Sequence, residues 1–366
     1  MPGLKDRGDL RARPSAAASQ SIPCASAPWS IREEEYPERA PLREKLLFFL
    51  RYAILAPSTY NSQPWLFRVG DDVVEVIADF ARELPAVDPE RRELIMSCGA
   101  VVCNLRTAAA NFGYATTLTM FPEAARRDLV ARARVTGTLA PGVEDRARFR
   151  AIPTRRRNVV CFDASPPSSM LLVGLAERVK QFGAWLAYID QPEIKDAVVR
   201  LIAEADRRQV DDPAFRAELE RWTREQGDPR ADGIPRDWHQ GVSSLPDFGV
   251  PVWSQAIGSV GPGEQHAAHV RQRIGSPPLL AVLGTSTDAP QSWLDAGQAL
   301  LEAELQARAA GVWFTDFNQP IQHQGLRAQL RQLVGMGHPQ ALVRIGYGAE
   351  VAPTPRRNLE EMLADV

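Results

Sequence analysis

PSTYNSQPW, residues 57–65, separates two apolar runs and combines two prolines and a tryptophan with hydroxyl and amide side chains. Residues 43–56 before it carry apolar side chains at helical spacing. Because a residue that precedes a proline is disfavoured in a helix, we expect this helix to end at Pro57. After it, residues 65–69 and 73–77 flank Gly-Asp-Asp and predict a β-hairpin. The stretch is longer and more polar than a turn requires, so its polar side chains need a further explanation.

The composition indicates which class of protein this is. The chain has 366 residues, of which 45% are hydrophobic and 24% charged, as in ordinary soluble globular proteins. Its net charge of −2 gives no reason to expect nucleic acid or an anionic membrane as partner. No apolar run approaches the roughly 18 residues that a membrane helix needs. Residues 1–38, rich in Arg, Ala, Ser and Pro, contain no apolar segment of signal-peptide length, and we expect them to form a disordered tail.

The cysteines and histidines indicate neither a metal site nor a disulfide framework. Cys98 and Cys103 lie five residues apart in a helical run, where neither a CxxC motif nor a zinc knuckle would place them. The five histidines are scattered along the chain, and no nucleophile–base pair emerges. We therefore expect buried, reduced thiols, no bound metal and a cytoplasmic protein. No GxGxxG pattern predicts a dinucleotide-binding Rossmann domain.

The second half of the chain repeats the order of features in the first. Residues 168–189 predict a helix and a strand, as residues 43–69 do earlier. Long apolar helices follow at residues 89–112, with Asp88 as the expected cap, and at residues 292–311. The spacings also agree, since 14 residues separate Gly99 from Gly113 and Gly297 from Gly311, and nine separate Gly113 from Pro122 and Gly311 from Pro320. Repeated features in one order indicate a duplicated α+β unit.

The two halves differ in length. Trp65 and Gly99 are 34 residues apart, whereas Trp185 and Gly297 are 112 apart, so the second half carries 78 more residues. Insertions of this length are usually functional lids or disordered segments. The aromatic side chains of Trp222, Trp238, Phe248 and Trp253 favour a lid that packs onto another part of the protein.

The opening stretch resembles a known family. APSTYNSQPWLF, residues 56–67, is similar to the APSxxNxQPWxF signature of the flavin-dependent nitroreductases, and residues 88–114 and 338–359 resemble the Acg-like branch of that family. The resemblance implies an α+β nitroreductase-like fold with FMN at the interface of two subunits. In the Acg-like branch two subunit-like halves are fused. The resemblance therefore implies a monomer with an internal pseudo-dimer, formed here by residues 39–149 and 150–366, with a lid-like insertion at about residues 205–275. Further oligomerisation stays open.

The resemblance also assigns candidate cofactor-binding residues. The loop would supply small hydroxyl and amide groups, which suit the edge of the isoalloxazine ring because they impose no charge. Arginines would grip the phosphate dianion through charge-assisted hydrogen bonds. Without the family pattern, the arginine triplet TRRRN would be taken as a solvated surface, and Arg157 and Val159 stand where the family often has Ser or Thr and a second arginine. Which arginine faces the phosphate therefore stays open. The candidates are Pro57, Ser58, Thr59, Asn61, Gln63, Arg155, Arg156, Arg157, Asn158, Thr315, Arg356 and Arg357.

Two functions follow from the resemblance and the insertion. The first is an FMN-dependent oxidoreductase in which NAD(P)H is the transient electron donor and a nitroaromatic or quinone-like small molecule is the acceptor. The second is a flavin-sequestering protein with little turnover, because a lid over the ring would exclude donor and acceptor alike. The sequence assigns no catalytic side chain and does not identify the physiological acceptor.

Overall fold

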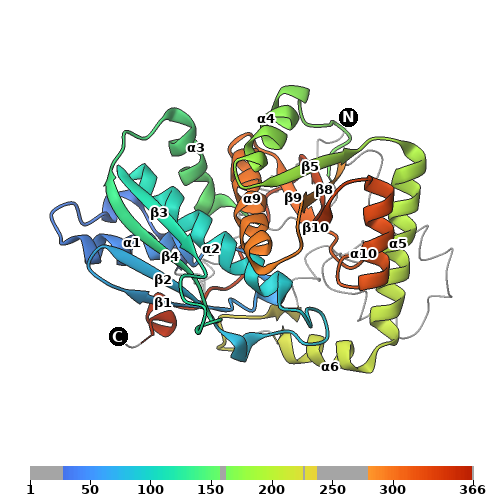
Figure 1. The fold of residues 1–366 in the computed structure, drawn as a ribbon, viewed down its shortest axis with the longest axis horizontal. Coiled ribbons are helices and arrows are strands. Elements are labelled where there is room, and N and C mark those ends of the chain that lie inside the picture. Colours follow the sequence, from blue (N-terminus) through green and yellow to red (C-terminus); the bar gives the residue numbers. More distant parts are fainter. Residues whose placement is uncertain (1–27, 157–161, 226, 237–278, 365–366) are drawn as a thin grey trace, which may run out of the picture.

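The computed structural model describes residues 28–156, 162–225, 227–236 and 279–364, and these form two lobes packed side by side (Figure 1). The first lobe contains α1 (Leu42–Ala53), β1 (Trp65–Val69), β2 (Val73–Ala78), α2 (Arg92–Asn111), β3 (Tyr114–Met120), β4 (Leu129–Thr138) and α3 (Val143–Ala151). The second contains α4 (Ser169–Lys180), β5 (Ala184–Ile189), α5 (Pro192–Asp211), α6 (Pro213–Trp222), β6 (Thr223–Arg224), β7 (Ile234–Pro235), β8 (Leu279–Thr285), α9 (Pro290–Ala309), β9 (Trp313–Asp316), α10 (Gln324–Val334) and β10 (His338–Gly346).

Each lobe is built on an antiparallel four-stranded sheet. The strand order is β1-β2-β4-β3 in the first lobe and β5-β8-β10-β9 in the second. When the elements are matched in chain order, the two sheets have the same order. The predicted α+β class is confirmed, and the repeated order agrees with the duplication inferred from the glycine spacings. The division of the chain into halves at residue 150 stays a prediction.

Helices α2 and α9 cross at the two glycines that the sequence repeat matches. A Cβ atom on Gly99 would collide with the carbonyl oxygen of Leu294, and one on Gly297 would collide with that of Met96. Leu294 and Met96 each lie three residues before the glycine of their own helix, so the contact is reciprocal. An interface of this kind is typical of two units related by a twofold axis.

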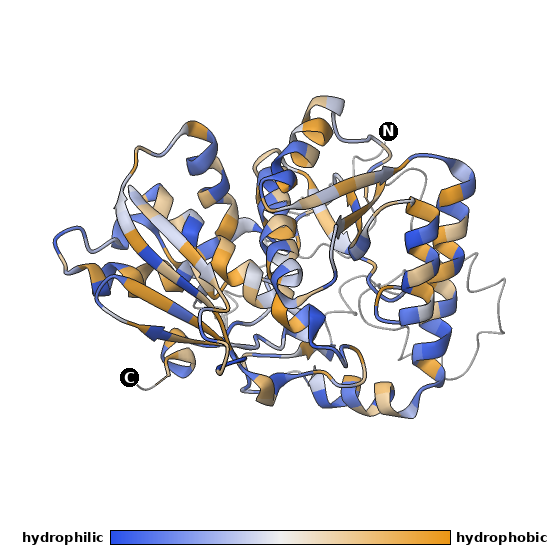
Figure 2. Cartoon of the chain, in the orientation of Figure 1, coloured by the Kyte–Doolittle hydropathy of each residue, from blue (hydrophilic) through white to orange (hydrophobic). Residues whose placement is uncertain are grey.

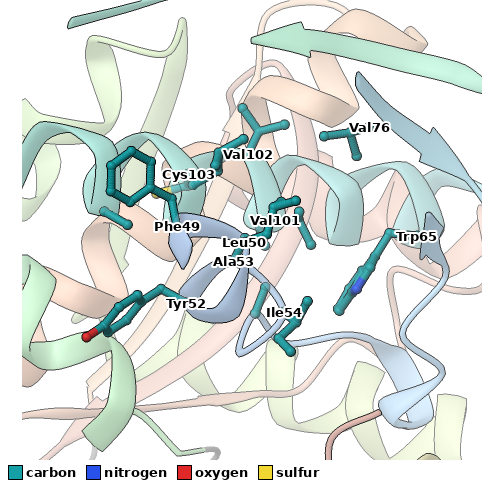
Figure 3. Packing of buried hydrophobic residues seen from close by; sticks show 14 of the residues in the cluster. Phe49, Leu50, Tyr52, Ala53, Ile54, Trp65, Val76, Val101, Val102 and Cys103 are labelled. Atoms are coloured by element: carbon teal, nitrogen blue, oxygen red, sulfur yellow. The ribbon is translucent and has the colours of Figure 1, made fainter. Parts of the chain in front are cut away.

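The buried core runs through both helices. Trp65 and the apolar side chains of α1 and α2 pack together (Figure 3), and Leu294, Leu301 and Leu305 of α9 belong to the same cluster. Trp65 is fully buried, as expected of a core residue. Amphipathic α5 shows both hydrophobic and hydrophilic residues along its length (Figure 2).

Two helix ends differ from the sequence expectation. Helix α1 ends at Ala53 rather than at Pro57, and Ile54 is its C-cap. Helix α2 begins at Arg92, three residues later than a cap at Asp88 would place it. The Asp88 carboxylate nevertheless accepts a hydrogen bond at 2.8 Å from the backbone N–H of Leu94. It therefore satisfies one of the free donors of the helix N-terminus from a more distant position.

The prediction of a disordered tail over residues 1–38 is wrong for its last part. Trp29 and Ile31 are buried, η2 (Glu33–Glu35) forms a short 3-10 helix, and Tyr36 stacks on Phe112 with ring centroids 4.2 Å apart. Aromatic burial of this kind outweighs the polar composition around it. Residues 1–27 lie outside the described residues.

The thiols and the insertion are described only in part. Cys98 and Cys103 are free and buried, as predicted, whereas Cys24 and Cys161 fall outside the described ranges. The described part of the insertion comprises the end of α5, α6, β6 and β7, and residues 237–278 fall outside. Among the helices that the structure describes, none combines the length and apolarity of a membrane span.

Candidate functional site

The stretch after α1 folds as a strained loop. Its 3-10 turn η3 (Thr59–Asn61) is entered from Ser58, and Tyr60, Asn61 and Gln63 have φ angles of 53°, 52° and 49°. Left-handed conformations cost non-glycine residues about 1 kcal/mol or more each, so the surrounding structure must impose them. One restraint is local, since the Ser58 hydroxyl oxygen accepts a hydrogen bond at 2.9 Å from the backbone N–H of Gln63. Strain of this kind concentrates at functional sites.

Asn61 joins three separate parts of the chain. Its amide nitrogen donates to the carbonyl oxygens of Gly233, at 3.1 Å, and of Pro355, at 3.0 Å. Its amide oxygen accepts from the Arg356 guanidinium at 2.7 Å. The side chain is buried, and both ends of its amide are hydrogen-bonded to the protein. Asn61 therefore ties the loop to the second lobe.

Gln63 makes a similar set of contacts. Its amide nitrogen donates to the carbonyl oxygen of Ala231 at 2.8 Å and to that of Asn61 at 3.3 Å. Its amide oxygen accepts from the backbone N–H of Arg357 at 2.9 Å. With no exposed surface, this side chain fixes the end of the loop against the C-terminal segment.

Two arginines from distant segments meet at the end of α1. Arg155, after α3, and Arg356, after β10, both donate to the carbonyl oxygen of Leu55, at 3.1 and 3.4 Å. Arg356 also donates to the carbonyl oxygen of Ala56 at 3.1 Å, and Arg155 pairs with Glu304 of α9 at 3.2 Å. Both guanidinium groups are buried. Their positive charge lies next to the loop that Asn61 anchors.

Arg156 completes a cationic cluster. Its guanidinium lies 4.1 Å from the ring centroid of Trp29, and that of Arg356 lies 4.8 Å from the same centroid. Burial, together with the positive charges of Arg155 and Arg308, lowers the pKa of Arg156 to about 10, and Glu350 only partly opposes this. A half-buried arginine whose protonated form is destabilised by its neighbours indicates a place that would be stabilised by an anion.

The described part of the insertion forms an arm over the loop. We define this arm as residues 213–225 and 227–236. Trp222 of the arm belongs to one apolar cluster with Tyr60, whereas Trp238, Phe248 and Trp253 fall outside the described residues, and the lid stays a prediction. The Asp232 carboxylate accepts from both Arg82 and Arg224. Arg82 in turn donates to the carbonyl oxygen of Ser62 at 2.6 Å.

A buried acidic group lies on the other side of the loop. The Thr59 hydroxyl donates to the Glu93 carboxylate at 2.7 Å, and Glu93 pairs with Arg92 at 2.9 Å. Burial and the negative charge of Glu93 raise the pKa of nearby Asp88 to about 6, against the opposing effect of Arg92. Thr59 is thus committed to the first lobe, while Asn61 and Gln63 bind the second lobe and the arm.

The remaining candidates lie elsewhere or outside the described residues. Arg357 donates to the carbonyl oxygens of Gln63, at 3.4 Å, and Glu361, at 2.9 Å, and so belongs to the loop cluster. Thr315 lies in β9, opposite Arg344 of β10, within the second sheet. Arg157 and Asn158 are not among the described residues. The part of the chain that the structure describes contains no group of three or more His, Cys, Asp or Glu able to hold a metal ion.

Several site residues were missed by sequence reasoning. Trp29 lies in a segment of tail-like composition, and Asp232 lies in a segment of low periodicity. Arg308, which lies 3.9 Å from the ring centroid of Trp313 and donates to the carbonyl oxygen of Thr154, is one of many arginines at helix ends. For Trp29 the sequence does contain a signal, which is a tryptophan in otherwise polar surroundings, as at position 222.

The chain is similar to curated proteins over most of its length. It is 30% identical over 329 residues to the putative NAD(P)H nitroreductase Rv3131 of Mycobacterium tuberculosis. The aligned region covers 88% of this chain and 92% of that protein. It is 29% identical over 323 residues to the uncharacterized protein Rv3127 of the same organism, covering 85% and 90%. The putative NAD(P)H nitroreductase acg is 26% identical over 322 residues, covering 86% and 93%.

Solved nitroreductase structures match about 60% of this chain at low sequence identity. The FMN- and NADPH-dependent nitroreductase NfnB from Sphigopyxis sp. strain HMH matches with a TM-score of 0.37 and 17% identity, covering 60% of this chain and 98% of that one. NfnB from Mycobacterium smegmatis, solved in complex with NADPH, matches with a TM-score of 0.36 and 16% identity, covering 60% and 98%. No family model matches the chain.

Proposed function

Because this chain belongs to the nitroreductase family, in its Acg-like branch, we propose that it is an FMN-dependent oxidoreductase. In this proposal NAD(P)H supplies the reducing equivalents, a nitroaromatic or quinone-like molecule accepts them, and the flavin lies where the two lobes meet. The loop after α1 contributes one side of the site, and the arginines that follow α3 and β10 contribute the other.

One contact carries the proposal. The hydrogen bond at 2.7 Å between Arg356 and Asn61 joins residues that are 295 positions apart. The two segments that the family pattern assigns to opposite ends of the cofactor are therefore neighbours in space. Arg155 reaches the same place through the carbonyl oxygen of Leu55.

The cationic cluster fits a phosphate. Arg155, Arg156 and Arg356 come from two segments and converge around Trp29 and the end of α1. Burial lowers the pKa of Arg156, and the positive charges of Arg155 and Arg308 lower it further. A phosphate dianion would stabilise the buried positive charge through charge-assisted hydrogen bonds. We assign Arg156 the closest role, because Arg155 and Arg356 donate to the backbone carbonyls of Leu55 and Ala56, whereas Arg156 donates through Nη1 to carbonyls of its own segment and is less buried.

The loop would serve the flavin ring mainly through its shape. The amides of Asn61 and Gln63 are hydrogen-bonded to protein groups at both ends, so we assign them the task of holding the strained backbone in place. Ser58 accepts a hydrogen bond from Gln63, which leaves its own proton as a donor toward a ring edge. A preorganised loop lowers the entropy cost of binding a rigid cofactor.

Bound FMN would supply the redox chemistry, taking a hydride from NAD(P)H and delivering electrons to the acceptor. The chain itself would bind the phosphate through its arginines, orient the ring by the loop and limit the access of water through the arm. Asn61→Ala is expected to shift the flavin absorption bands while the affinity for FMN falls only slightly. The reason is that Asn61 holds the loop beside the ring, whereas several arginines bind the phosphate.

One observation supports the second function, flavin sequestration. The arm is hydrogen-bonded to the loop through Ala231 and Gly233, and its Phe215 ring packs edge-on against Tyr60, so it covers part of the candidate site. Such a cover would suit a protein that sequesters flavin and turns over slowly.

Two measurements test these functions. Purified protein incubated with FMN and then desalted should retain yellow flavin absorbance in about equimolar amount if the site is intact. Absence of retained flavin would overturn both functions. Steady-state oxidation of NADH and NADPH with a nitroaromatic or a quinone then separates them: rapid turnover supports the oxidoreductase, whereas tight flavin binding without turnover supports sequestration.

A further inference from the structure

Trp29 contacts the candidate phosphate site, although it belongs to the segment before α1. The guanidinium of Arg156 lies 4.1 Å from its ring centroid, and that of Arg356 lies 4.8 Å from it. One indole ring therefore contacts a cation from the segment after α3 and a cation from the segment after β10. The family signature of the first lobe begins at residue 56 and does not include this tryptophan.

The indole ring of Trp29 is held by two parts of the protein. Its side chain is 8% exposed and belongs to the apolar core cluster of the first lobe. Its Nε1 donates a hydrogen bond at 2.7 Å to the carbonyl oxygen of Thr354. The hydroxyl oxygen of Thr354 accepts at 2.7 Å from Arg356. The ring is therefore positioned by the core and by the same segment that carries Arg356.

The contact with Trp29 leaves donors of Arg156 available. The N–H groups of arginine lie in the plane of the guanidinium, so a guanidinium that lies over an aromatic ring does not use them for that contact. Arg156 donates through Nη1 to the carbonyl oxygens of Pro153, at 2.8 Å, and Arg155, at 2.7 Å. Among the described residues, no acceptor is hydrogen-bonded to its Nε or Nη2. These two donor groups are suited to an oxygen of an added anion.

The carboxylates near Arg156 are paired with other arginines. Glu304 pairs with Arg155 at 3.2 Å, and Glu350 pairs with Arg308. Glu350 also attracts Arg156 electrostatically, but no carboxylate in the described part of the chain lies within ion-pair distance of Arg156. The indole ring and two backbone carbonyl oxygens, rather than a carboxylate, therefore hold this guanidinium in place.

We propose that Trp29 is a positioning residue, which holds the guanidinium groups of Arg156 and Arg356 in the arrangement that binds the phosphate of the flavin. The proposal rests on the proposed function, because it concerns the same site. A cation–π contact offsets part of the cost of bringing two positive charges together. Side chains that are ordered before binding also lower the entropy cost of binding. Trp29 should therefore raise the affinity for a flavin that carries a phosphate and leave the affinity for the ring system unchanged.

The test compares FMN with riboflavin, which has the same ring system but no phosphate. Fluorescence titration of the full chain gives both affinities for the unmodified protein, Trp29→Leu and Trp29→Phe. Trp29→Leu should weaken FMN binding about tenfold, the equivalent of one charge-assisted hydrogen bond, and leave riboflavin binding unchanged. Trp29→Phe keeps an aromatic ring and should bind FMN within about threefold of the unmodified protein.

Phe80→Leu is the matched control. Phe80 is partly buried against the same core cluster, and its ring centroid lies 4.3 Å from the guanidinium of Arg91, so this variant also removes an aromatic ring from an arginine. Neither affinity should change. Tetrafluorotryptophan incorporated at position 29 keeps the shape of the side chain but weakens its attraction for cations. It should weaken FMN binding selectively, so the answer does not depend on whether Trp29→Leu folds.

A further measurement needs no flavin. Inorganic phosphate, compared with chloride at equal ionic strength, should raise the thermal unfolding midpoint of the cofactor-free protein more than that of cofactor-free Trp29→Leu.

The outcomes separate this proposal from the proposed function. FMN affinity that is unchanged in Trp29→Leu and with the fluorinated side chain, or an equal loss of FMN and riboflavin affinity, would overturn the role of Trp29 and leave the flavin site standing. Absence of flavin binding, together with stabilisation by phosphate that depends on Trp29, would overturn the proposed function and support Trp29 as part of an anion site. Absence of both would overturn both.

Discussion

Asp232 connects the arm to the first lobe through a carboxylate that two arginines share. It accepts from Arg82 and, at 2.8 and 3.0 Å, from Arg224. The residues on either side of it, Ala231 and Gly233, present the carbonyl oxygens that bind Gln63 and Asn61. We therefore infer that Asp232 positions these two amides and, through them, the strained loop.

Asp232→Asn should loosen the loop. The substitution keeps the size of the side chain but removes the charge between two largely buried guanidinium groups. We expect the free energy of unfolding to fall by about 2 kcal/mol, because each arginine loses a charged partner. The flavin absorption bands should shift as well. The measurements are urea unfolding without cofactor and the spectrum of the loaded protein.

Asp228→Asn is the matched control for this variant. Asp228 belongs to the same arm but pairs with Arg230, which is exposed. Exposed pairs contribute little, so neither stability nor the flavin spectrum should change. Equal behaviour of the two variants would show that Asp232 has no special position.

Asp88 gives the pH dependence a definite sign. Its pKa in the folded protein is raised to about 6 by burial and by the charge of Glu93, whereas the pKa of an aspartate in the unfolded chain lies near 3.8. The folded state therefore binds the proton more tightly, and stability should rise as the pH falls through 6 toward 4. Asp88→Asn should flatten this dependence and stabilise the protein at pH 8 by about 1 to 3 kcal/mol. Urea unfolding at pH 5 to 8 checks it; an unaltered slope in the variant would contradict it.

At this scale the sequence predicts only part of the site. The loop and Arg356 follow from a local pattern and a family signature, and the structure brings them together. Trp29 and Asp232 could not be predicted in the same way. Their partners, Arg356 and Arg82, are 327 and 150 residues distant in the chain, and no local periodicity encodes such a contact.

At the scale of elements, the crossing of α2 and α9 depends on two glycines. A side chain at Gly99 or Gly297 would meet backbone oxygen of the other helix, which cannot move aside as a side chain can. Gly99→Ala and Gly297→Ala should each lower the free energy of unfolding by about 2 to 3 kcal/mol through overpacking.

Gly325→Ala in α10 is the control, because no atom lies within 4 Å of the place that its Cβ would take. It should stabilise by up to about 1 kcal/mol through helix propensity. Chemical unfolding of the three variants decides, and a neutral Gly99→Ala would mean that the helices are further apart.

The elements themselves were more predictable than their ends. Glycine spacing identified α2 and α9 as equivalent because close helix packing constrains the same position twice. The sequence predicts that α1 ends at the proline, whereas the helix ends at Ala53 and the carbonyl oxygen of Leu55 accepts from two arginines. A tertiary contact thus decides where the helix stops, and the local sequence contains no record of it.

At the scale of the whole molecule, the C-terminal segment of the second lobe crosses to the first. After Arg356 and Arg357 it forms η7 (Leu359–Met362) beside β1 (Figure 1), Ala364 donates to the carbonyl oxygen of Phe67 at 2.8 Å, and Trp65 donates to the sulfur of Met362. The segment that carries the arginines is therefore part of the structure that joins the lobes. Loss of these arginines should weaken both cofactor binding and the union of the two lobes.

Comparison of single arginine variants can separate these two roles. Arg356→Ala removes hydrogen bonds to Leu55, Ala56 and Asn61, so it should lower both FMN retention and the stability of the cofactor-free protein. In the double variant with Arg357→Ala, the binding free energy of FMN should be less favourable by several kcal/mol, on the order of the contribution of two charged hydrogen bonds.

Arg156→Ala should behave differently, because this arginine is repelled by Arg155 and Arg308 in the cofactor-free protein. Its removal should weaken FMN binding by about 1.5 to 3 kcal/mol, the contribution of one charged hydrogen bond, without lowering cofactor-free stability. Arg150→Ala, at an exposed position near the end of α3, should change neither. Fluorescence titration with FMN and urea unfolding give both quantities for each variant. Retention of FMN by Arg156→Ala at the level of the unmodified protein would show that the phosphate is held elsewhere, whereas selective loss would place it on the cationic cluster around Trp29.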